Sequence, residues 1–517
     1  MRRIQRALVS VSDKTGIAPF AAGLASLDVE IISTGGTAKL LREQGLKVRD
    51  VSEFTGFPEM LDGRVKTLHP RVHGGILTIR SNPEHQRQVR EHGIQFIDLV
   101  AVNLYPFEKT AAREGVKFEE LIENIDIGGP SMIRSAAKNF EDVTVVVDAA
   151  DYDPVLAELR QTSGGISRET RARLARKAFA MTAAYDGAIS STLQRWAGAT
   201  LPENLHLNFH KLMDLRYGEN PHQQAALYLD PAARGRGLAA ARQLQGKELS
   251  YNNLVDLEAA WRLVSEFTEP ATAIIKHTNP CGIATAPTLA ESYSKALAVD
   301  PVSAFGSVIA FNRVVDGATA AEMAKLFVEA VVAAGYGAPA LERLAAKKNL
   351  RLIDMSTTAA DEYGWQLKSI GGGLLVQTPD ALAANAETWK CVTERQPTEP
   401  ERQALVFAWR VVKHVKSNAI VYARDGVAVG VGAGQMSRVD SVKLAAWKAR
   451  ELGHSLEATV VASDAFFPFP DGLEEAAHAG ATAVVEPGGS VRDAEVIAAA
   501  NRLGVAMMFT GVRHFRH

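Results

Sequence analysis

Short apolar runs alternate with helical patterns over the first part of the chain, from residue 5 to about 148. Four of the runs have the length and composition of strands: 7–11, 29–32, 98–103 and 143–147. Glycine-bearing breaks follow several of them, and this alternation is typical of a parallel α/β sheet. Ligands bind such sheets beyond the carboxyl ends of the strands, so the loops there are the first candidates for chemistry.

Residues 151–198 have a mostly helical pattern that is rich in Ala, Arg and Leu, with a soft break at 162–165. A chain of 517 residues is too long for one ordinary hydrophobic core. We therefore expect a first domain over 1–150, a helical connector over 151–200 that also packs, and a second domain over 201–517.

The most informative stretch of the second half is 271–282, an apolar run that leads into Lys276, His277 and a segment with Pro and Gly. The pattern predicts a buried strand that leaves its sheet at this break. Lysine is a fixed cation and histidine is the side chain that titrates nearest to neutral pH, so a rigid strand end would aim two catalytic groups. The alternative is a buried histidine beside a lysine that reaches toward solvent.

A short sequence echo indicates an internal repeat in the second half. Residues 274–277 read Ile-Ile-Lys-His, residues 411–414 read Val-Val-Lys-His, and Ile283 aligns with Ile420. A duplicated α/β unit would place two strand ends around a pseudo-twofold axis. The segment that follows residue 412 would then face the first strand end.

Composition and charge limit the class of protein. Hydrophobic residues make up 47% of the chain and charged residues 22%, and the formal charge of −2 gives no global attraction to nucleic acid or to an anionic membrane. Two cysteines, Cys281 and Cys391, are too few for a disulfide framework or a Cys-rich metal site. No apolar run reaches the roughly 18 residues of a membrane span, and the N-terminal run is too short for a signal peptide, so we expect a cytoplasmic protein.

Two loops of the first domain combine hydroxyl side chains, glycine and the start of a predicted helix. They are 10–16 and 33–39, each after one of the predicted strands. Backbone N–H groups and the helix dipole favour an anion at such a place, so we interpret both loops as a phosphate site. Simple helix capping by Ser or Thr is the alternative for either loop alone.

Two further loops of the first domain carry ionisable side chains. Segment 63–70 includes Arg64 and Lys66 between a glycine and a proline, which indicates a defined loop, although a solvated charge run is the alternative. Asp126 precedes a predicted helix that carries Lys138. An Asp at the mouth of the helix and a Lys about two turns along predict an acid/base pair.

The second domain contains further recognition motifs. Segment 216–223 joins Arg, Tyr and amide side chains, which suits a phosphorylated heterocycle. Aromatic turns at 303–306 and 463–469 could stack on a ring, with core packing as the alternative for a single Phe. Segment 513–517 follows a predicted strand directly, so we expect it to be tied down.

A zinc deaminase is disfavoured by the ligands that are missing. Such enzymes use H-x-E and P-C-x-x-C motifs. Here Cys281 is followed by 282–284 without a second cysteine, and 277–279 lacks the acidic residue. Zinc needs three or four ligands, and this region offers at most two.

With these motifs assembled, the chain resembles the bifunctional purine biosynthesis family that has AICAR transformylase and IMP cyclohydrolase activities. The resemblance covers 5–517 and rests on segments 10–16, 34–37, 63–70, 103–106, 126–129, 216–223, 276–282 and 463–469. It implies an α/β protein with an N-terminal methylglyoxal-synthase-like parallel-sheet domain. The C-terminal domain would hold two cytidine-deaminase-like units without zinc, about 201–375 and 376–517. The family forms an intertwined homodimer with shared transformylase sites, and its partners are small molecules rather than nucleic acid or membranes.

The resemblance implies formyl transfer from 10-formyltetrahydrofolate, a cosubstrate, to the 5-amino group of AICAR, without a metal. His277 would accept the proton of the amine, Lys276 would stabilise the oxyanion or help to protonate the folate nitrogen, and Asn418 would orient the reacting groups. Residues implied to bind AICAR are Arg216, Tyr217, Phe305, Gly306, Glu329 and Arg513. Residues implied to bind folate are Asp464, Phe466, Phe467 and Arg438.

The second implied reaction closes formyl-AICAR to IMP with loss of water, so the enzyme folds one substrate and moves protons. By resemblance, Lys66, Tyr105, Asp126 and Lys138 carry proton transfer and oxyanion stabilisation. Residues implied to bind this substrate are Ser10, Ser12, Lys14, Thr34, Gly35, Gly36, Thr37, Arg64, Thr67, Asn103, Gly128 and Gly129. A nucleotide deaminase-like enzyme and a nucleotide-binding sensor are the competing hypotheses.

Overall fold

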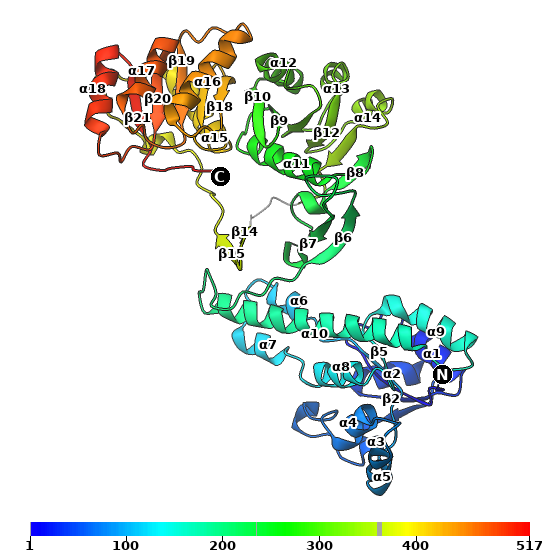
Figure 1. Ribbon diagram of the computed structural model, residues 1–517. Coiled ribbons are helices and arrows are strands. Elements are labelled where there is room, and N and C mark those ends of the chain that lie inside the picture. The colour runs from blue at the N-terminus through cyan, green and yellow to red at the C-terminus, as the bar shows by residue number, and fades with distance from the viewer. Residues whose placement is uncertain (1, 234, 359–363) are drawn as a thin grey trace. The chain divides into compact units, whose positions relative to one another are not determined.

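The computed structural model describes residues 2–233, 235–358 and 364–517. The chain divides into two compact units, Met1–Asn208 and Phe209–His517 (Figure 1). In the described part of the chain, no helix is both long enough and apolar enough to cross a membrane.

The first unit is built on a five-stranded sheet in the order β3-β2-β1-β4-β5, with every neighbouring pair parallel. Its strands are β1 (Arg6–Ser10), β2 (Glu30–Ser33), β3 (Val48–Asp50), β4 (Leu99–Val102) and β5 (Thr144–Val146). The parallel sheet and its four predicted strands are confirmed. The strand that the sequence did not predict, β3, has three residues, of which only Val48 is buried.

Helices surround this sheet and cover its apolar residues. They are α1 (Ile17–Ala25), α2 (Gly35–Glu43), α3 (Val51–Thr55), α4 (Pro70–Leu77), α5 (Pro83–Glu91), α6 (Phe107–Ala111), α7 (Phe118–Glu123), α8 (Gly128–Lys138), α9 (Tyr152–Gln161) and α10 (Arg168–Trp196), with 3-10 turns at Leu61–Gly63 and Ala149–Asp151. Predicted segment 151–200 is helical, with its break between α9 and α10. Helix α10 packs on α8 and β5, and α9 packs on α1 through stacked rings of Phe20 and Tyr152, 4.4 Å apart. This segment lies within the first unit.

The second unit contains a twelve-stranded sheet. In spatial order its strands are β16 (Lys390–Cys391), β21 (Ala506–Phe509), β20 (Ala481–Glu486), β19 (Thr459–Ser463), β17 (Ile420–Arg424), β18 (Val427–Gly432), β10 (Asn279–Thr285), β9 (Ala271–Lys276), β11 (Ser307–Phe311), β12 (Val328–Ala333), β13 (Arg351–Asp354) and β8 (Arg242–Gln245). Its helices are α11 (Tyr251–Val264), α12 (Leu289–Val299), α13 (Gly317–Met323), α14 (Ala338–Leu344), α15 (Glu399–Val412), α16 (Arg438–Glu451), α17 (Pro470–Ala479) and α18 (Asp493–Leu503), with 3-10 turns at Pro231–Ala233, Leu238–Ala240 and Ala386–Thr388.

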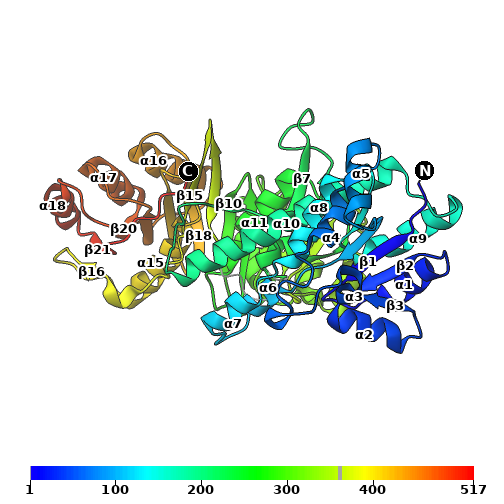
Figure 2. The same cartoon turned by 90° about the horizontal axis from the view of Figure 1, so that it is seen from below.

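The second unit repeats one order of elements. The series from α11 to β13 matches the series from α15 to β21, and the sheet order is symmetrical about the antiparallel pair β10–β18. Helices α11 and α15 share one core on one face of the sheet, while α16–α18 and α12–α14 pack on the other face (Figure 1). Figure 2 shows α16, α17 and α18 next to one another toward the red, C-terminal end of the chain. The likeness of either half to a deaminase stays a prediction.

The repeat has a different alignment from the predicted one. Residues 274–276 lie in β9, whereas Val411 and Val412 end helix α15. The alignment of 274–277 with 411–414 is therefore wrong, because the order of elements pairs β9 with β17. The echo is a chance likeness between a buried strand and the buried face of a helix.

The predicted exit of the chain after Lys276 is also wrong. Strand β10 follows at once and pairs with β9, so His277 and Thr278 form a two-residue hairpin turn with φ of 51° and 62°. Positive φ at both positions is the type I′ geometry that suits twisted hairpins. The register shifts between Pro280 and Gly282, so these residues mark a bulge at the start of a strand.

Two hairpins form separate two-stranded sheets. One joins β6 (His210–Leu215) to β7 (Ala225–Leu229), and the other joins β14 (Gln366–Ile370) to β15 (Gly373–Gln377) (Figure 1). Apolar side chains of the second hairpin are exposed, namely Leu367, Ile370, Leu374 and Leu375. An isolated two-stranded hairpin is marginally stable in water, so these hairpins are incomplete structures by themselves.

Candidate active sites

The two predicted phosphate loops meet at the carboxyl ends of β1 and β2. The hydroxyls of Ser10 and Thr34 are 2.9 Å apart, and Lys14 Nζ donates to Thr37 Oγ1 at 2.8 Å. Burial lowers the pKa of Lys14. Neither loop caps its helix through a side chain in the described residues, so the capping alternative does not account for their hydroxyls.

The third strand end of this edge is tied to the first loop. Asn103 Oδ1 accepts from the Ser12 amide at 2.5 Å and from the Asp13 amide at 3.0 Å. At the start of α2, a β-carbon on Gly36 would have no heavy atom of the described chain within 4 Å. Open space at a helix N-terminus is where an anion can approach the backbone N–H groups.

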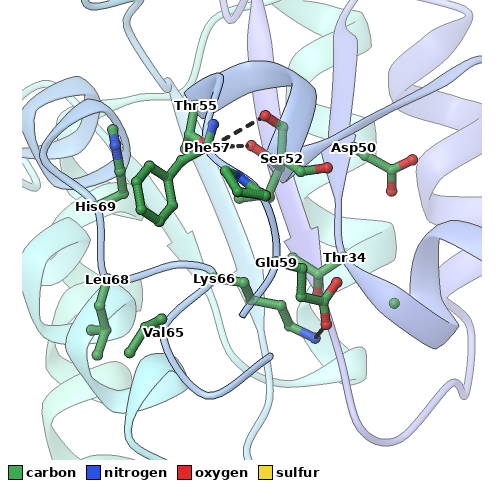
Figure 3. A pocket seen from close by; sticks show the side chains of 13 residues that line it. Thr34, Asp50, Ser52, Thr55, Phe57, Glu59, Val65, Lys66, Leu68 and His69 are labelled. Atoms are coloured by element: carbon green, nitrogen blue, oxygen red, sulfur yellow. Dashed lines mark hydrogen bonds and ion pairs between the residues drawn. The ribbon is translucent and has the colours of Figure 1, made fainter. Parts of the chain in front are cut away.

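Lys66 lies against the second loop. Its Nζ is 3.7 Å from Glu59 Oε1, and a β-carbon on Gly35 would lie 3.5 Å from the same ammonium. Figure 3 shows Lys66 and Glu59 pointing toward one another beside Thr34. They line a cavity of about 180 Å³ together with Gly35, Asp50, Val51, Ser52, Thr55, Phe57, Pro58, Val65, Leu68 and His69.

Asp126 is held before α8 by backbone donors. Its Oδ1 accepts from the Gly129 amide at 2.9 Å, and the Tyr105 amide also donates to the carboxylate. Burial raises the pKa of Asp126, while these hydrogen bonds and the charge of Lys66 act in the opposite direction. Lys66, Tyr105 and Asp126 therefore belong to one region, and the side chain of Tyr105 is half exposed.

Thr67 also belongs to this region, because a β-carbon on Gly128 would lie 2.5 Å from its hydroxyl. Arg64 instead forms an ion pair with Glu123 of α7. The predicted Asp126–Lys138 pair is not formed. Lys138 is exposed in the last turn of the eleven-residue helix α8, about 15 Å along the axis from its start at 1.5 Å per residue.

In the second unit, the hairpin turn presents His277 to solvent, so the alternative of a buried histidine is wrong. Lys276 Nζ donates to the carbonyl oxygens of Phe305 at 2.9 Å and Gly306 at 3.0 Å. The Asp256 carboxylate accepts from the Thr278 amide at 2.7 Å. Burial raises the pKa of Asp256, and the nearby Thr278 amide and His277 oppose that shift.

The turn is joined to the segment that carries Asn418. Asn279 Oδ1 accepts from the Lys416 amide at 3.0 Å. Asn418 Oδ1 accepts from Arg438 Nη2 at 2.7 Å, and its Nδ2 donates to the carbonyl of Gln435 at 2.9 Å. The hydrogen bond between Asn279 and Lys416 joins segment 277–279 of one half of the repeat to segment 416–418 of the other.

Three of the four residues expected to bind folate are interior, namely Asp464, Phe467 and Arg438. Asp464 is fully buried and bonds to Arg438, the Ser417 hydroxyl and the Ala419 amide. Phe467 is fully buried in the core and offers no surface to a ligand, whereas Phe466 is half-buried. Asp464 and Arg438 thus support Asn418 from inside the protein.

The remaining predicted residues lie at separate places. Arg216 stacks on Tyr217 on the β6–β7 hairpin, with 4.6 Å from guanidinium to ring centroid, and Arg513 stacks on Phe515 at 4.3 Å. Glu329 pairs with Arg351 at 2.9 Å. The ring of Phe305 is 61% exposed beside Lys276, as a ligand-stacking residue requires.

Sequence reasoning missed Asp256, Glu59 and Asp50. Asp50 is the last residue of β3. The expectation that ligands bind at the carboxyl ends of strands would have pointed to Asp50 if that short strand had been predicted. Asp256 comes from the interior of α11, which that expectation does not cover. Glu59 lies in 56–60, a segment without periodicity.

Comparisons with known proteins decide the family. The MGS-like domain model matches residues 16–131, and the AICARFT/IMPCHase bienzyme model matches residues 136–448. The chain belongs to the AICARFT/IMPCHase bienzyme family. The bifunctional purine biosynthesis protein PurH of Magnetococcus marinus is 56% identical to this family member over 532 residues, covering 100% of both chains. The protein in the crystal structure of ForH is 41% identical in sequence. The match covers 37% of the present chain and 96% of the ForH chain, with a TM-score of 0.35.

Members of this bienzyme family are AICAR transformylases and IMP cyclohydrolases. The chain is accordingly a purine biosynthesis enzyme that formylates AICAR with 10-formyltetrahydrofolate and closes the product to IMP. The predicted family, the parallel-sheet MGS-like domain and both activities are confirmed, and the deaminase and sensor hypotheses are set aside. The described residues contain no group of three or more His, Cys, Asp or Glu side chains placed to hold a metal ion.

Proposed function

We propose that formyl transfer takes place at the β9–β10 turn and that His277 accepts the proton of the AICAR amine. The observation that carries this proposal is the hydrogen bond from Lys416 to Asn279, because it joins the turn to the segment of Asn418. His277 is exposed to a substrate, and Asn418 is fixed from three directions by Arg438, Gln435 and Met436. A fixed amide can orient both reacting groups.

Lys276 would stabilise the oxygen of the formyl group. An ammonium has three N–H donors, and two are used by the carbonyl oxygens of Phe305 and Gly306. The third is left for the negative charge that develops on the formyl oxygen as the amine attacks. Phe305 would stack on the imidazole ring of AICAR. Arg216, Tyr217 and Arg513 would bind the same substrate only if an assembly of protein chains places them beside the β9–β10 turn.

We further propose that ring closure takes place in the first unit, with the phosphate at the start of α2 and Lys66, Tyr105 and Asp126 around the base. The raised pKa of Asp126 supports proton transfer, because a carboxyl group titrating closer to neutral pH is a better general acid or base. The pair Lys66–Glu59 would separate when a substrate enters the cavity. The role of Lys138 in proton transfer, which the resemblance implies, stays a prediction.

The experiment is to assay both reactions separately on His277→Ala and Lys66→Ala. His277→Ala is expected to lose formyl transfer and to keep cyclisation of supplied formyl-AICAR, and Lys66→Ala is expected to do the reverse. Loss of both reactions in a folded variant would show that the two sites are wrongly assigned.

We also propose a cytoplasmic homodimer in which the exposed β14–β15 hairpin packs on a second copy. Its apolar side chains and its two-stranded sheet need such a cover. Leu374→Asp is expected to shift the sedimentation coefficient from dimer to monomer and to abolish formyl transfer. A monomeric wild-type protein with full activity would contradict the proposal.

A further inference from the structure

Four ionisable side chains meet beside the segment that carries Asn418: Glu266, Lys413, His414 and Arg516. We call them the charge cluster. Glu266 Oε1 accepts from Lys413 Nζ at 2.8 Å and lies 3.0 Å from His414 Nε2. Arg516 Nη1 donates to the carbonyl oxygen of His414 at 3.1 Å. The side chains of Lys413 and His414 are about nine-tenths buried, so these contacts are sheltered from water.

The charge cluster joins the two halves of the repeat at matching positions. Glu266 lies two residues after α11, and His414 lies two residues after α15. These helices are the first of each half and share one core. The repeat therefore places position 266 of one half against position 414 of the other. A glutamate and a histidine occupy these positions, and they can form a hydrogen bond with each other.

The partners of His414 define the tautomer of its neutral form. Arg516 Nη1 lies 3.5 Å from His414 Nδ1, and a guanidinium can only donate. The proton of a neutral His414 is therefore on Nε2, from which it donates to Glu266. Burial lowers the pKa of His414, the hydrogen bond and the charge of Glu266 oppose that shift, and the charges of Arg516 and Lys413 act with burial. Burial alone would raise the pKa of Glu266, yet His414 and Lys413 together lower it to about 2.

Arg516 also connects the charge cluster to the active-site segment through its backbone. The Ser417 amide donates to the Arg516 carbonyl oxygen at 3.0 Å, and the Arg516 amide donates to Ser417 Oγ at 3.3 Å. Lys416 Nζ donates to the His517 carbonyl oxygen at 2.8 Å. Segment 416–418 is thus held between Asn279 on one side and 516–517 on the other.

We propose that Arg516 and Glu266 are positioning residues for formyl transfer. They fix segment 416–418, and with it Asn418, relative to the His277 turn that comes from the other half. Neither side chain touches the reacting atoms, so their loss acts on the alignment of His277 and Asn418 and not on the binding of AICAR phosphate. The inference rests on the proposed location of formyl transfer. A buried ion pair is weak evidence for net stability, and in some proteins such pairs fix a unique arrangement.

The test compares Arg516→Met, Arg516→Lys and Glu266→Gln with the control Arg502→Met, which removes an exposed arginine of α18 that pairs with Glu474. Arg516→Met is expected to lower kcat for formyl transfer by about 10²-fold, the effect of misplacing a reacting group by roughly 1 Å. Its KM for AICAR should change less than threefold. Arg516→Lys keeps one donor toward His414 and should recover about tenfold of the lost rate.

The folding control is calorimetric unfolding of the second unit in the same samples, because cyclisation of formyl-AICAR reports only on the first unit. A kcat for formyl transfer within twofold of wild type in Arg516→Met would overturn the proposal. So would equal losses in Arg516→Met and Arg516→Lys, or a rise in KM without a fall in kcat. If Arg516→Met does not fold, Glu266→Gln and Arg516→Lys replace it in the test. The proposal then requires a fall in their kcat for formyl transfer with little change in KM for AICAR.

Failure of the active-site location is a separate result. If His277→Ala keeps wild-type formyl transfer, the location is wrong whatever the Arg516 variants show. If His277→Ala is inactive and Arg516→Met is unaffected, the location stands and the charge cluster is not a positioning device.

Discussion

Glu486 makes the stability of the second unit fall as pH rises, and Glu486→Gln should remove that dependence. Its side chain is fully buried at the end of β20. Oε2 accepts from the Phe467 amide at 2.6 Å, and Oε1 has no hydrogen-bond partner among the residues that the structure describes. Burial, with a smaller contribution from Asp493, raises the pKa of Glu486 to about 8.

The direction of the pH dependence of stability follows from the direction of this pKa shift. The folded protein keeps the proton of Glu486 up to about pH 8, whereas the unfolded chain releases it near the ordinary value of 4.5. Between these two values the folded state binds more protons, so its stability decreases as pH rises. At about 1.4 kcal/mol for each pH unit, the interval corresponds to a loss of up to about 5 kcal/mol.

Glutamine has the shape of the protonated carboxyl group and no charge to bury. Wild type and Glu486→Gln should therefore unfold at similar temperatures near pH 4.5, and the variant should be more stable by up to about 5 kcal/mol above pH 8. The assay is calorimetric unfolding of the full chain at a series of pH values, following the transition of the second unit.

The matched control is Glu495→Gln, an exposed glutamate of α18 that is 3.5 Å from Arg492. A surface change of this kind should move stability by no more than about 0.5 kcal/mol at any pH. A temperature gap between wild type and Glu486→Gln that stays constant from pH 4.5 to 8.5 would refute the reasoning.

Two further predictions concern the active sites. Asp256→Ala leaves the Thr278 amide without its acceptor and should lower kcat for formyl transfer about tenfold, as loss of one charge-assisted hydrogen bond implies. Asp256→Asn should lower kcat less. Equal rates for wild type and both variants would contradict a role of Asp256 in holding the turn. Asp126→Asn should slow cyclisation of formyl-AICAR by about 10² to 10⁴, as loss of a general acid or base implies, while formyl transfer is unchanged. Asp153→Asn, an exposed change in α9, is the control, and a cyclisation rate like wild type in Asp126→Asn would exclude Asp126 from proton transfer.

The parallel sheet of the first unit could be predicted because its strands are short, apolar runs that are buried on both faces. Strand β4 (Leu99–Val102) is buried at every position. Strand β3 could not be predicted, since Arg49 and Asp50 are polar and half-buried and pair only at the edge of the sheet.

The hairpin at His277 was missed for a different reason. Type I′ turns usually show Asn-Gly or another glycine pair, whereas this one uses His277 and Thr278 at positive φ. Pro280 and Gly282 belong to a bulge. Proline and glycine ordinarily end a strand, but here they lie inside strand β10. A turn exposes His277 as well as a strand exit would, so the role of His277 stays a prediction that the structure allows.

Pairings between distant segments were the least predictable feature. The direct Asp126–Lys138 pair failed because α8 separates the two residues by three turns. Asp256, Glu266 and Arg516 reach the second site from a helix, a helix end and a terminal segment, and their contacts depend on tertiary packing. The Lys413-His414 motif was noticed for a likeness to Lys276-His277 that the structure does not bear out, yet it lies in the charge cluster.

The central claim is that two separate sites carry the two reactions, and complementation tests it most directly. His277→Ala and Lys66→Ala are each supplied with AICAR and 10-formyltetrahydrofolate, alone and mixed in equal amounts, and IMP is measured. Neither variant alone should form IMP, whereas the mixture should, because Lys66→Ala makes formyl-AICAR and His277→Ala closes it. Absence of IMP from a mixture of two folded variants would contradict the account.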